Sequence, residues 1–134
     1  GRRHVDHRVS GARPDPDGCV LDVDEDGVGP ACALRDGARI MLYYVGISSR
    51  PGAPNRHAIG LAVSDDGLAF ERLRGEAIFA PGDGDPYSTA IPYVGRSAEG
   101  FEMWYHSTTG WYHEAGRREA TYTIRHAVSN DGIR

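Results

Sequence analysis

Apolar and polar positions alternate along the chain in short runs, and no run has the spacing of a helix. In the stretch 122–128 (Tyr-Thr-Ile-Arg-His-Ala-Val), small or apolar residues occupy every second place, which is typical of a strand with one buried face. No window keeps an apolar residue at every third and fourth place without an interrupting Gly or Pro. The pattern therefore predicts an all-β chain built from short strands.

One motif occurs twice and groups the strands into two units. The stretch Ile59–Leu68 returns as Ile124–Ile133, and both copies contain Ala-Val-Ser-x-Asp-Gly. An aromatic strand precedes each copy, Ile40–Tyr44 in the first unit and Phe101–Tyr105 in the second. The other predicted strands are Gly29–Leu34 and Ala69–Leu73 in the first unit and Ala90–Val94 in the second. Each unit therefore reads as a series of antiparallel strands, and the second unit lacks its last strand.

Turn residues separate these predicted strands. Asp-Gly pairs, which favour tight turns, occur at Asp36-Gly37 and inside both copies of the repeated motif. The chain is also rich in Gly, with 18 residues, and contains 8 Pro. Between the last two strands of the second unit, the stretch 108–122 is longer than its counterpart, and we expect it to form a loop.

Strand units that recur about every 60 residues favour the blades of a β-propeller. A β-sandwich is the alternative, but it would not explain the constant spacing. We predict an all-β fold, a β-propeller fragment of two four-stranded antiparallel blades, the second incomplete. Residues 1–17 would be a linker or the end of a preceding blade, 18–80 one blade and 81–134 the next, truncated. Because closing a propeller takes about four to eight blades, the expected partners are further blades of the same chain or copies of it.

Three sequence features carry a resemblance to a known family. They are the acidic stretch 24–30 (Asp-Glu-Asp-Gly-Val-Gly-Pro) followed by the aromatic strand 40–44, the Met-Trp-Tyr strand within 101–107, and the doubled Ala-x-Ser-x-Asp-Gly hairpin. Together they resemble the five-bladed β-propeller superfamily of glycoside hydrolase families 43, 32 and 130, over a region from about Gly18 to the end. Sialidases have a similar hairpin, but here Gly67 arrives one residue earlier. The resemblance implies a protein that acts on or binds a glycan.

Two acidic residues are candidates for catalysis. Glycoside hydrolysis usually needs two carboxyl groups across the scissile bond. The resemblance implies that such acids stand at the starts of innermost strands, where Asp26 and Asp85 are found. It implies Asp26 as base or nucleophile and Asp85 as an orienting or pKa-setting acid, with Asp24 a neighbouring substrate contact. The general-acid Glu, expected from a further blade, is not identified in this sequence. The alternative is that these Asp side chains cap turns by accepting backbone hydrogen bonds.

Three more residues are candidate substrate contacts. His106 follows an aromatic strand and could hydrogen-bond a sugar, or it could be a packed loop histidine. Arg125 could hold a carboxylate or a sugar hydroxyl, and a structural ion pair is its alternative role. Trp111 lies in the expected loop, so it is the aromatic side chain best placed to stack on a sugar. Tyr43 and Trp104 recur at equivalent places, which favours packing between blades instead.

Charge and motif content narrow the classes of partner and cofactor. The net charge is −4 with Arg as the basic residue type, and no basic cluster indicates nucleic-acid binding. The acids of Asp22-x-Asp24-x-Asp26-Gly27 resemble the start of a calcium loop, but Ala33 stands where a Glu should close it, so no metal site is predicted. No cofactor is expected. Cys19 and Cys32 could pair, although nothing in their spacing requires it.

No apolar run reaches the length of a membrane span, so no membrane partner is expected. No signal peptide is visible, and the compartment stays open with a slight preference for the cytoplasm. Three functions remain in competition. The first is hydrolysis or phosphorolysis of a glycosidic bond through paired carboxylates. The second is non-catalytic carbohydrate binding in polysaccharide metabolism, and the third is a protein-binding scaffold.

Overall fold

The computed structural model describes residues 8–10, 26–50, 53–82 and 84–133. In these ranges the regular elements are all strands, and no helix has the length and apolar character needed to cross a membrane. The strands are β1 (Arg8–Ser10), β2 (Gly27–Asp36), β3 (Arg39–Arg50), β4 (Ala53–Ser64), β5 (Ala69–Arg72), β6 (Ser88–Ser97), β7 (Gly100–Glu114) and β8 (Arg117–Ser129). The prediction of an all-β chain is confirmed.

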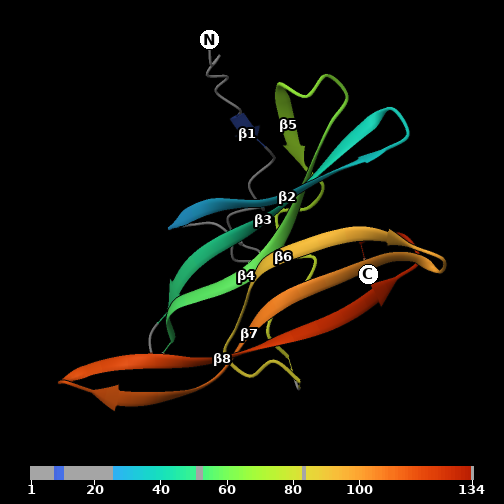
Figure 1. Cartoon of the computed structure of the whole chain (residues 1–134). Coiled ribbons are helices and arrows are strands. Elements are labelled where there is room, and N and C mark those ends of the chain that lie inside the picture. The colour runs from blue at the N-terminus through green and yellow to red at the C-terminus, as the bar shows by residue number, and fades with distance from the viewer. Residues whose placement is uncertain (1–7, 11–25, 51–52, 83, 134) are drawn as a thin grey trace, which may run out of the picture.

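The strands form two sheets that lie one above the other in Figure 1. In the first, β2 to β5 are joined in sequence order as antiparallel neighbours, and β1 adds a parallel fifth strand beside β5. In the second, β6, β7 and β8 are antiparallel, again in sequence order. This is a partial β-propeller-like fold with one four-stranded and one three-stranded antiparallel unit, as predicted.

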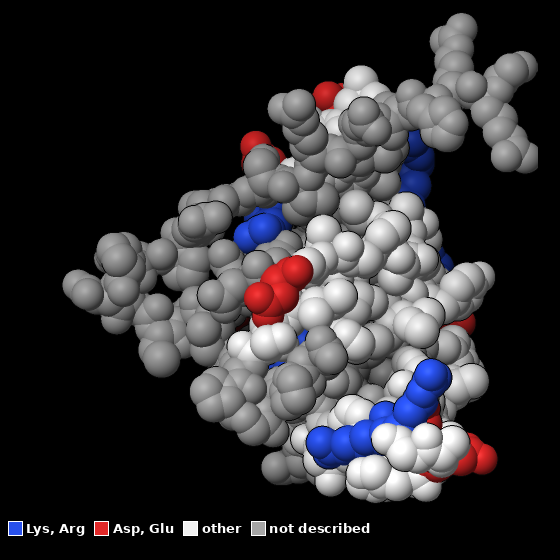
Figure 2. Space-filling model, turned by 90° about the vertical axis from the view of Figure 1, so that its left-hand side faces the viewer, with Lys and Arg blue, Asp and Glu red and all other residues white. Residues whose placement is uncertain are grey.

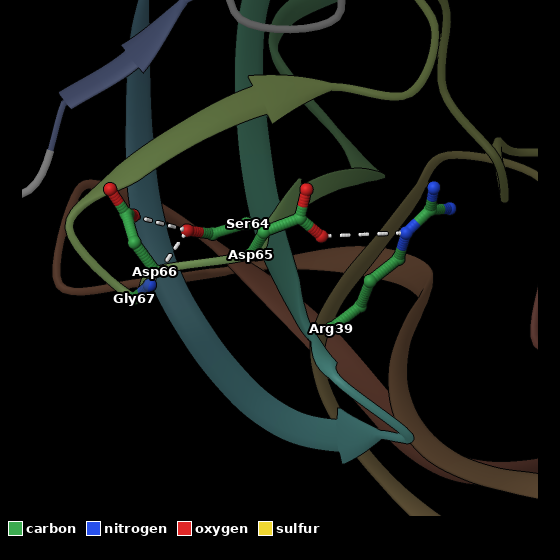
Figure 3. Close-up of polar contacts among 5 residues, drawn as sticks. All are labelled: Arg39, Ser64, Asp65, Asp66 and Gly67. Atoms are coloured by element: carbon green, nitrogen blue, oxygen red, sulfur yellow. Dashed lines mark hydrogen bonds and ion pairs between the residues drawn. The ribbon is translucent and has the colours of Figure 1, made fainter.

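The Asp-Gly turns form where the sequence places them, and the repeated turn has the same hydrogen bonds in both sheets. In the first sheet, the hydroxyl of Ser64 donates to Asp66 at 3.0 Å and accepts the N–H of Gly67 at 2.9 Å (Figure 3). In the second, Ser129 donates to Asp131 at 3.1 Å and accepts from the following Gly at 3.0 Å. The left-handed backbone at both glycines (φ 76° and 72°) explains why Gly closes each turn.

The stretch 108–122 is not a loop, and that expectation is wrong. It extends β7 and β8 into a long hairpin, which Figure 1 shows projecting from the lower edge of the molecule. The turn of this hairpin is Ala115-Gly116, with both residues at positive φ (50° and 77°). Two such residues match the right-handed twist of the strands, so the hairpin continues to its tip without a loop. Thr and Tyr in both arms, and Trp111 in the first, favour strand conformation.

The first strand of each antiparallel unit, β2 or β6, has a break in register at its centre. In β2 the break lies between Pro30 and Cys32, and in β6 it lies between Ala90 and Tyr93. Both strands stand at the edge of their sheets and contain a Pro, which lacks the N–H that an inner strand must donate. The two bulged edges lie side by side, since the Val94 N–H donates to the Cys32 sulfur at 3.3 Å. The edge strands β2 and β6 are therefore interrupted at the same level.

The main core lies between the two sheets. Met41, Tyr43, Ile59 and Leu61 of the first sheet pack against a second-sheet cluster of Val94, Phe101 and Tyr105. The buried Tyr43 hydroxyl donates to the carbonyl of Gly132 at 2.9 Å and so ties the last turn of the second sheet to the first. Burial of these apolar side chains holds the sheets face to face.

The opposite face of the first sheet has a smaller core of Tyr44, Ala58, Ala62 and Phe70. Here the Tyr44 ring lies directly over Gly60, where an added Cβ would stand 2.3 Å from a ring carbon. Gly60 is therefore required by close packing of the ring on the neighbouring strand.

Candidate functional site

The two predicted catalytic acids lie just before β2 and just before β6, as the sequence predicted. Asp26 is exposed, its N–H donates to the carbonyl of Ile47 at 2.9 Å, and its carboxylate accepts the N–H of Ser49. Its contacts therefore anchor the start of β2 to β3. Asp24 lies outside the described residues.

Asp85 is buried (7% exposed) at the end of the segment that links the sheets. Its backbone exchanges two hydrogen bonds with Gly82, both at 3.1 Å. One carboxylate oxygen accepts the Tyr105 hydroxyl at 3.0 Å, and the other lies 3.5 Å from Nε of Arg125. That second oxygen has no hydrogen-bond partner among the described residues besides this ion pair. Asp85 is thus held by groups from β7 and β8.

Burial, followed by the hydrogen bond to Asp85, raises the pKa of Tyr105 to about 12. The phenol is therefore a hydrogen-bond donor at neutral pH, which suits the carboxylate that it faces. Arg125 pairs across the sheet with Tyr105, and its side chain is 39% exposed. The arrangement fixes one edge of the guanidinium through Asp85 and leaves part of it accessible to solvent. The predicted residues Asp85 and Arg125 are brought together, whereas the described contacts do not join Asp85 to Asp26.

A groove runs along the bulged strands β2 and β6, with a volume of about 380 Å³. It is lined by Gly29, Pro30, Ala31, Val45, Ile47, His57, Ala90, Ile91, His106, Thr108 and Tyr122. The predicted contact His106 is in this groove, where its ring stacks against that of Tyr122 with 4.1 Å between centroids. Asp26 lies near one end, because it bonds to Ile47 of the lining. The walls are mainly apolar and contain two imidazoles, the Thr108 hydroxyl and the Tyr122 phenol.

His57 is a groove residue that the sequence analysis missed. Burial, and then the nearby His106, lower the pKa of this imidazole from its usual value, so it is neutral at pH 7. Its backbone N–H donates to Ser88 at 3.1 Å, which ties β4 to the start of β6. A single histidine ahead of an apolar stretch belongs to no sequence motif. His57 reaches the groove only because strands from both sheets come together there.

Ile91 is the second feature that sequence reasoning missed. It has φ 51°, a left-handed conformation that β-branched residues rarely adopt, and it lies within the bulge of β6. Strain of this kind persists only where surrounding structure enforces it, and it is often found at functional sites. No sequence signal marks it, since Gly would be the expected residue there.

Trp111 is on β7 and stands apart from the groove lining. The Arg118 guanidinium lies 4.3 Å from the centre of its ring, and the Tyr87 ring approaches it edge-on at 6.3 Å. One face of the indole is therefore taken by a cation–π contact, which leaves less of it for a sugar. Figure 2 shows basic and acidic side chains gathered at the lower end of the molecule, where this hairpin lies, and few in the middle of that face. In the described ranges, no three metal-ligating side chains gather into a cluster.

The chain has sequence relatives and a structural neighbour among known proteins. No family model matches the chain. It is similar to the uncharacterized proteins MT1551 and Rv1502 of two strains of Mycobacterium tuberculosis, each 34% identical over 110 residues. That alignment covers 82% of this chain and 36% of each relative, so the chain spans little more than a third of their length.

Among solved structures, the chain is similar to a glycosyl hydrolase from Bacteroides ovatus. The TM-score is 0.53 at 18% sequence identity, and the match covers 78% of this chain and 29% of that one. At this identity the likeness concerns the fold. The two-sheet unit described above is thus a distant form of a fold that also occurs in a glycosyl hydrolase.

Proposed function

We propose that the chain is part of a glycan-acting protein of glycoside-hydrolase-like fold, and that the groove along β2 and β6 holds a sugar unit. The groove is the observation that carries this proposal. Its volume of about 380 Å³ falls within the roughly 300–1,000 Å³ of small-molecule sites. A sugar ring has an apolar face and a rim of hydroxyls. The face of the Tyr122 ring that His106 does not cover suits the first. The imidazoles of His57 and His106 with the Thr108 hydroxyl suit the second.

The two acids take different parts in this proposal. Asp26 has an exposed carboxylate near one end of the groove, so it is the candidate base or nucleophile. Asp85 is buried, and we assign it the orienting part, because it fixes Arg125 through an ion pair. The paired-carboxylate mechanism then requires a further acid on the opposite side of the scissile bond. Non-catalytic glycan binding is the competing function, and it uses the same groove.

The test combines binding and turnover. The wild type and a His106→Ala variant are applied to a glycan array, with His113→Ala, an exposed histidine on the β7–β8 hairpin, as the control. Loss of the stacked imidazole should weaken binding by about tenfold, the equivalent of ~1.4 kcal/mol. Equal binding by the wild type and His106→Ala would remove the groove from the proposal.

Turnover is measured on chromogenic aryl glycosides with Asp26→Asn beside Asp65→Asn. Asp65 is an exposed acid that pairs with Arg39 at 3.6 Å, as Figure 3 shows. If Asp26 reacts, turnover should fall by about 100-fold or more in the first variant and stay unchanged in the second. Equal turnover in both would exclude Asp26 from catalysis. Glycan binding without turnover of any substrate would favour the non-catalytic function.

A further inference from the structure

The groove along β2 and β6 has mainly aliphatic walls. Most of its lining side chains come from three strands, β2, β3 and β6, and are Pro30, Ala31, Val45, Ile47, Ala90 and Ile91. Among the described residues, no Asp, Glu, Arg or Lys lines it. Its polar side chains are two imidazoles, the Thr108 hydroxyl and the Tyr122 phenol. The lining therefore suits a neutral ligand, and it offers hydrogen bonds to only part of that ligand's surface.

Both interrupted strands contribute a bulge residue to this groove. The register of β2 with β3 skips Ala31, the register of β6 with β7 skips Ile91, and both residues line the groove. Ile91 has φ 51° and is 66% exposed, so its conformation is strained and its side chain gains little from burial. A Gly there would avoid the strain. A large apolar side chain that is both strained and open to solvent points to a contact with a ligand.

We propose that the groove selects a neutral sugar that carries a methyl group, either a 6-deoxyhexose or an O-methylated sugar, and that Ile91 contacts this methyl group. The inference rests on the proposed function of the groove. A fully hydroxylated sugar would turn hydroxyls against the aliphatic walls, where they would lose hydrogen bonds to water without replacement. A methyl group at the same place gains from burial. The polar side chains of the groove are then left for the remaining hydroxyls.

The charges around the groove disfavour an acidic sugar. A carboxylate or phosphate is usually held by Arg or Lys, and the described lining contains neither. Burial, and then His106, lower the pKa of the His57 imidazole, so this ring supplies no positive charge at pH 7. The exposed carboxylate of Asp26 near one end of the groove would repel an anion. A wholly apolar ligand fits no better, because it would leave the imidazoles and hydroxyls without partners.

The test is a glycan array of matched pairs whose members differ in one group. The pairs are glucose with 6-deoxyglucose, galactose with 6-deoxygalactose, mannose with 6-deoxymannose, and glucose with 3-O-methylglucose. In at least one pair the protein should bind the methyl-bearing member about tenfold more tightly, a usual effect of one methyl-sized group in an apolar pocket. Preference in the deoxy pairs would identify a 6-deoxyhexose, and preference in the last pair would identify an O-methylated sugar.

Three variants locate the contact. Ile91→Asn should bring the two members of the preferred pair back toward equal binding, while the thermal unfolding midpoint stays the same or rises, because Asn tolerates a positive φ. Leu68→Asn, at an exposed apolar position outside the groove, should keep the preference. Gly29→Val narrows the groove where an added Cβ meets no atom within 4 Å. It should therefore fold normally and weaken the binding of both members.

The outcomes separate this inference from the function on which it rests. Equal binding of both members of every pair, weakened in Gly29→Val, would overturn the preference for a methyl group and leave the groove as a glycan site. A preference that Ile91→Asn retains would overturn the contact with Ile91. Binding that Gly29→Val leaves unchanged, or no binding of any member, would overturn the proposed function and this inference with it.

Discussion

At the scale of single residues, the structure shows how one buried carboxylate organises its surroundings. Asp85 receives the Tyr105 hydroxyl at 3.0 Å and lies beside Arg125, so three segments of the second unit meet at one side chain. A buried acceptor that loses its donor costs more than the average hydrogen bond contributes, because the group remains desolvated. Loss of the Tyr105 hydroxyl would therefore leave the buried Asp85 carboxylate without its hydrogen-bond donor.

Replacing Tyr105 by Phe should therefore destabilise the fold by about 1.5–3 kcal/mol, the range for hydrogen bonds to charged groups. Urea unfolding measures the loss. Tyr112→Phe, at an exposed position on the same strand, serves as the control and should change stability by less than about 0.5 kcal/mol. Equal effects of the two variants would mean that the bond between Tyr105 and Asp85 contributes nothing.

Two tyrosines make the fold sensitive to alkali. Burial is the main cause that raises the pKa of Tyr43 and of Tyr105 to about 12, from 10 in an unfolded chain. Because the folded state favours the neutral phenols, their stabilisation is complete below pH 10 and is lost as the pH rises toward 12. Urea unfolding at pH 8, 10 and 11 should show a falling free energy of unfolding above pH 10. The decline should be shallower in Tyr105→Phe, and a flat profile would contradict the assignment.

At the scale of elements, the β7–β8 hairpin shows what sequence patterns predict well and where they mislead. The Asp-Gly turns and the strands around Tyr43 and Trp104 were predicted correctly, because local turn chemistry and alternation determine them. The sequence predicts a loop here because the stretch 108–122 is longer than its counterpart, and the Ala-Gly turn lacks the usual Asn or Asp that would mark a hairpin. Strand pairing, rather than a recognisable turn, determines this element.

The turn of that hairpin should respond strongly to substitution. Gly116 has φ 77°, so Gly116→Ala should destabilise the hairpin by about 1 kcal/mol through backbone strain. Ala115→Asn should have the opposite effect, because Asn tolerates the positive φ of that residue. Thermal unfolding measures both. Gly82→Ala is the control, since an added Cβ there meets no atom within 4 Å. A stable Gly116→Ala protein would show that the hairpin does not need this turn.

The candidate site was less predictable than the fold. The positions of Asp26 and Asp85 followed from strand starts, yet sequence gave no indication that one would be exposed and the other buried. The groove depends on His57 and Ile91, which come from strands far apart in the chain and belong to no motif. Such groups become neighbours only through the stacking of sheets, so local patterns do not reveal them.

At the scale of the whole molecule, two sheets pack face to face, and the first three strands of the two antiparallel units pair in nearly the same register. The shared face combines an apolar core with a few directional bonds, among them the bond from Tyr43 to the Gly132 carbonyl at 2.9 Å. Because a unit of this kind buries apolar surface only by stacking, its stability depends on how many neighbours it has. The groove follows from this arrangement, because its lining residues come from both sheets.

The position of Cys32 allows the separation of the two sheets to be followed by thiol labelling. Its sulfur accepts the Val94 N–H at 3.3 Å, and its thiol donates to the Val94 carbonyl at 3.5 Å. The side chain is therefore held between β2 and β6. In a Cys19→Ser background, a thiol reagent should modify Cys32 mainly during moments when the sheets separate. The labelling rate would then report how often the sheets open. A ligand bound in the groove should slow the labelling, and a rate equal to that of a free thiol would show that the strands part freely.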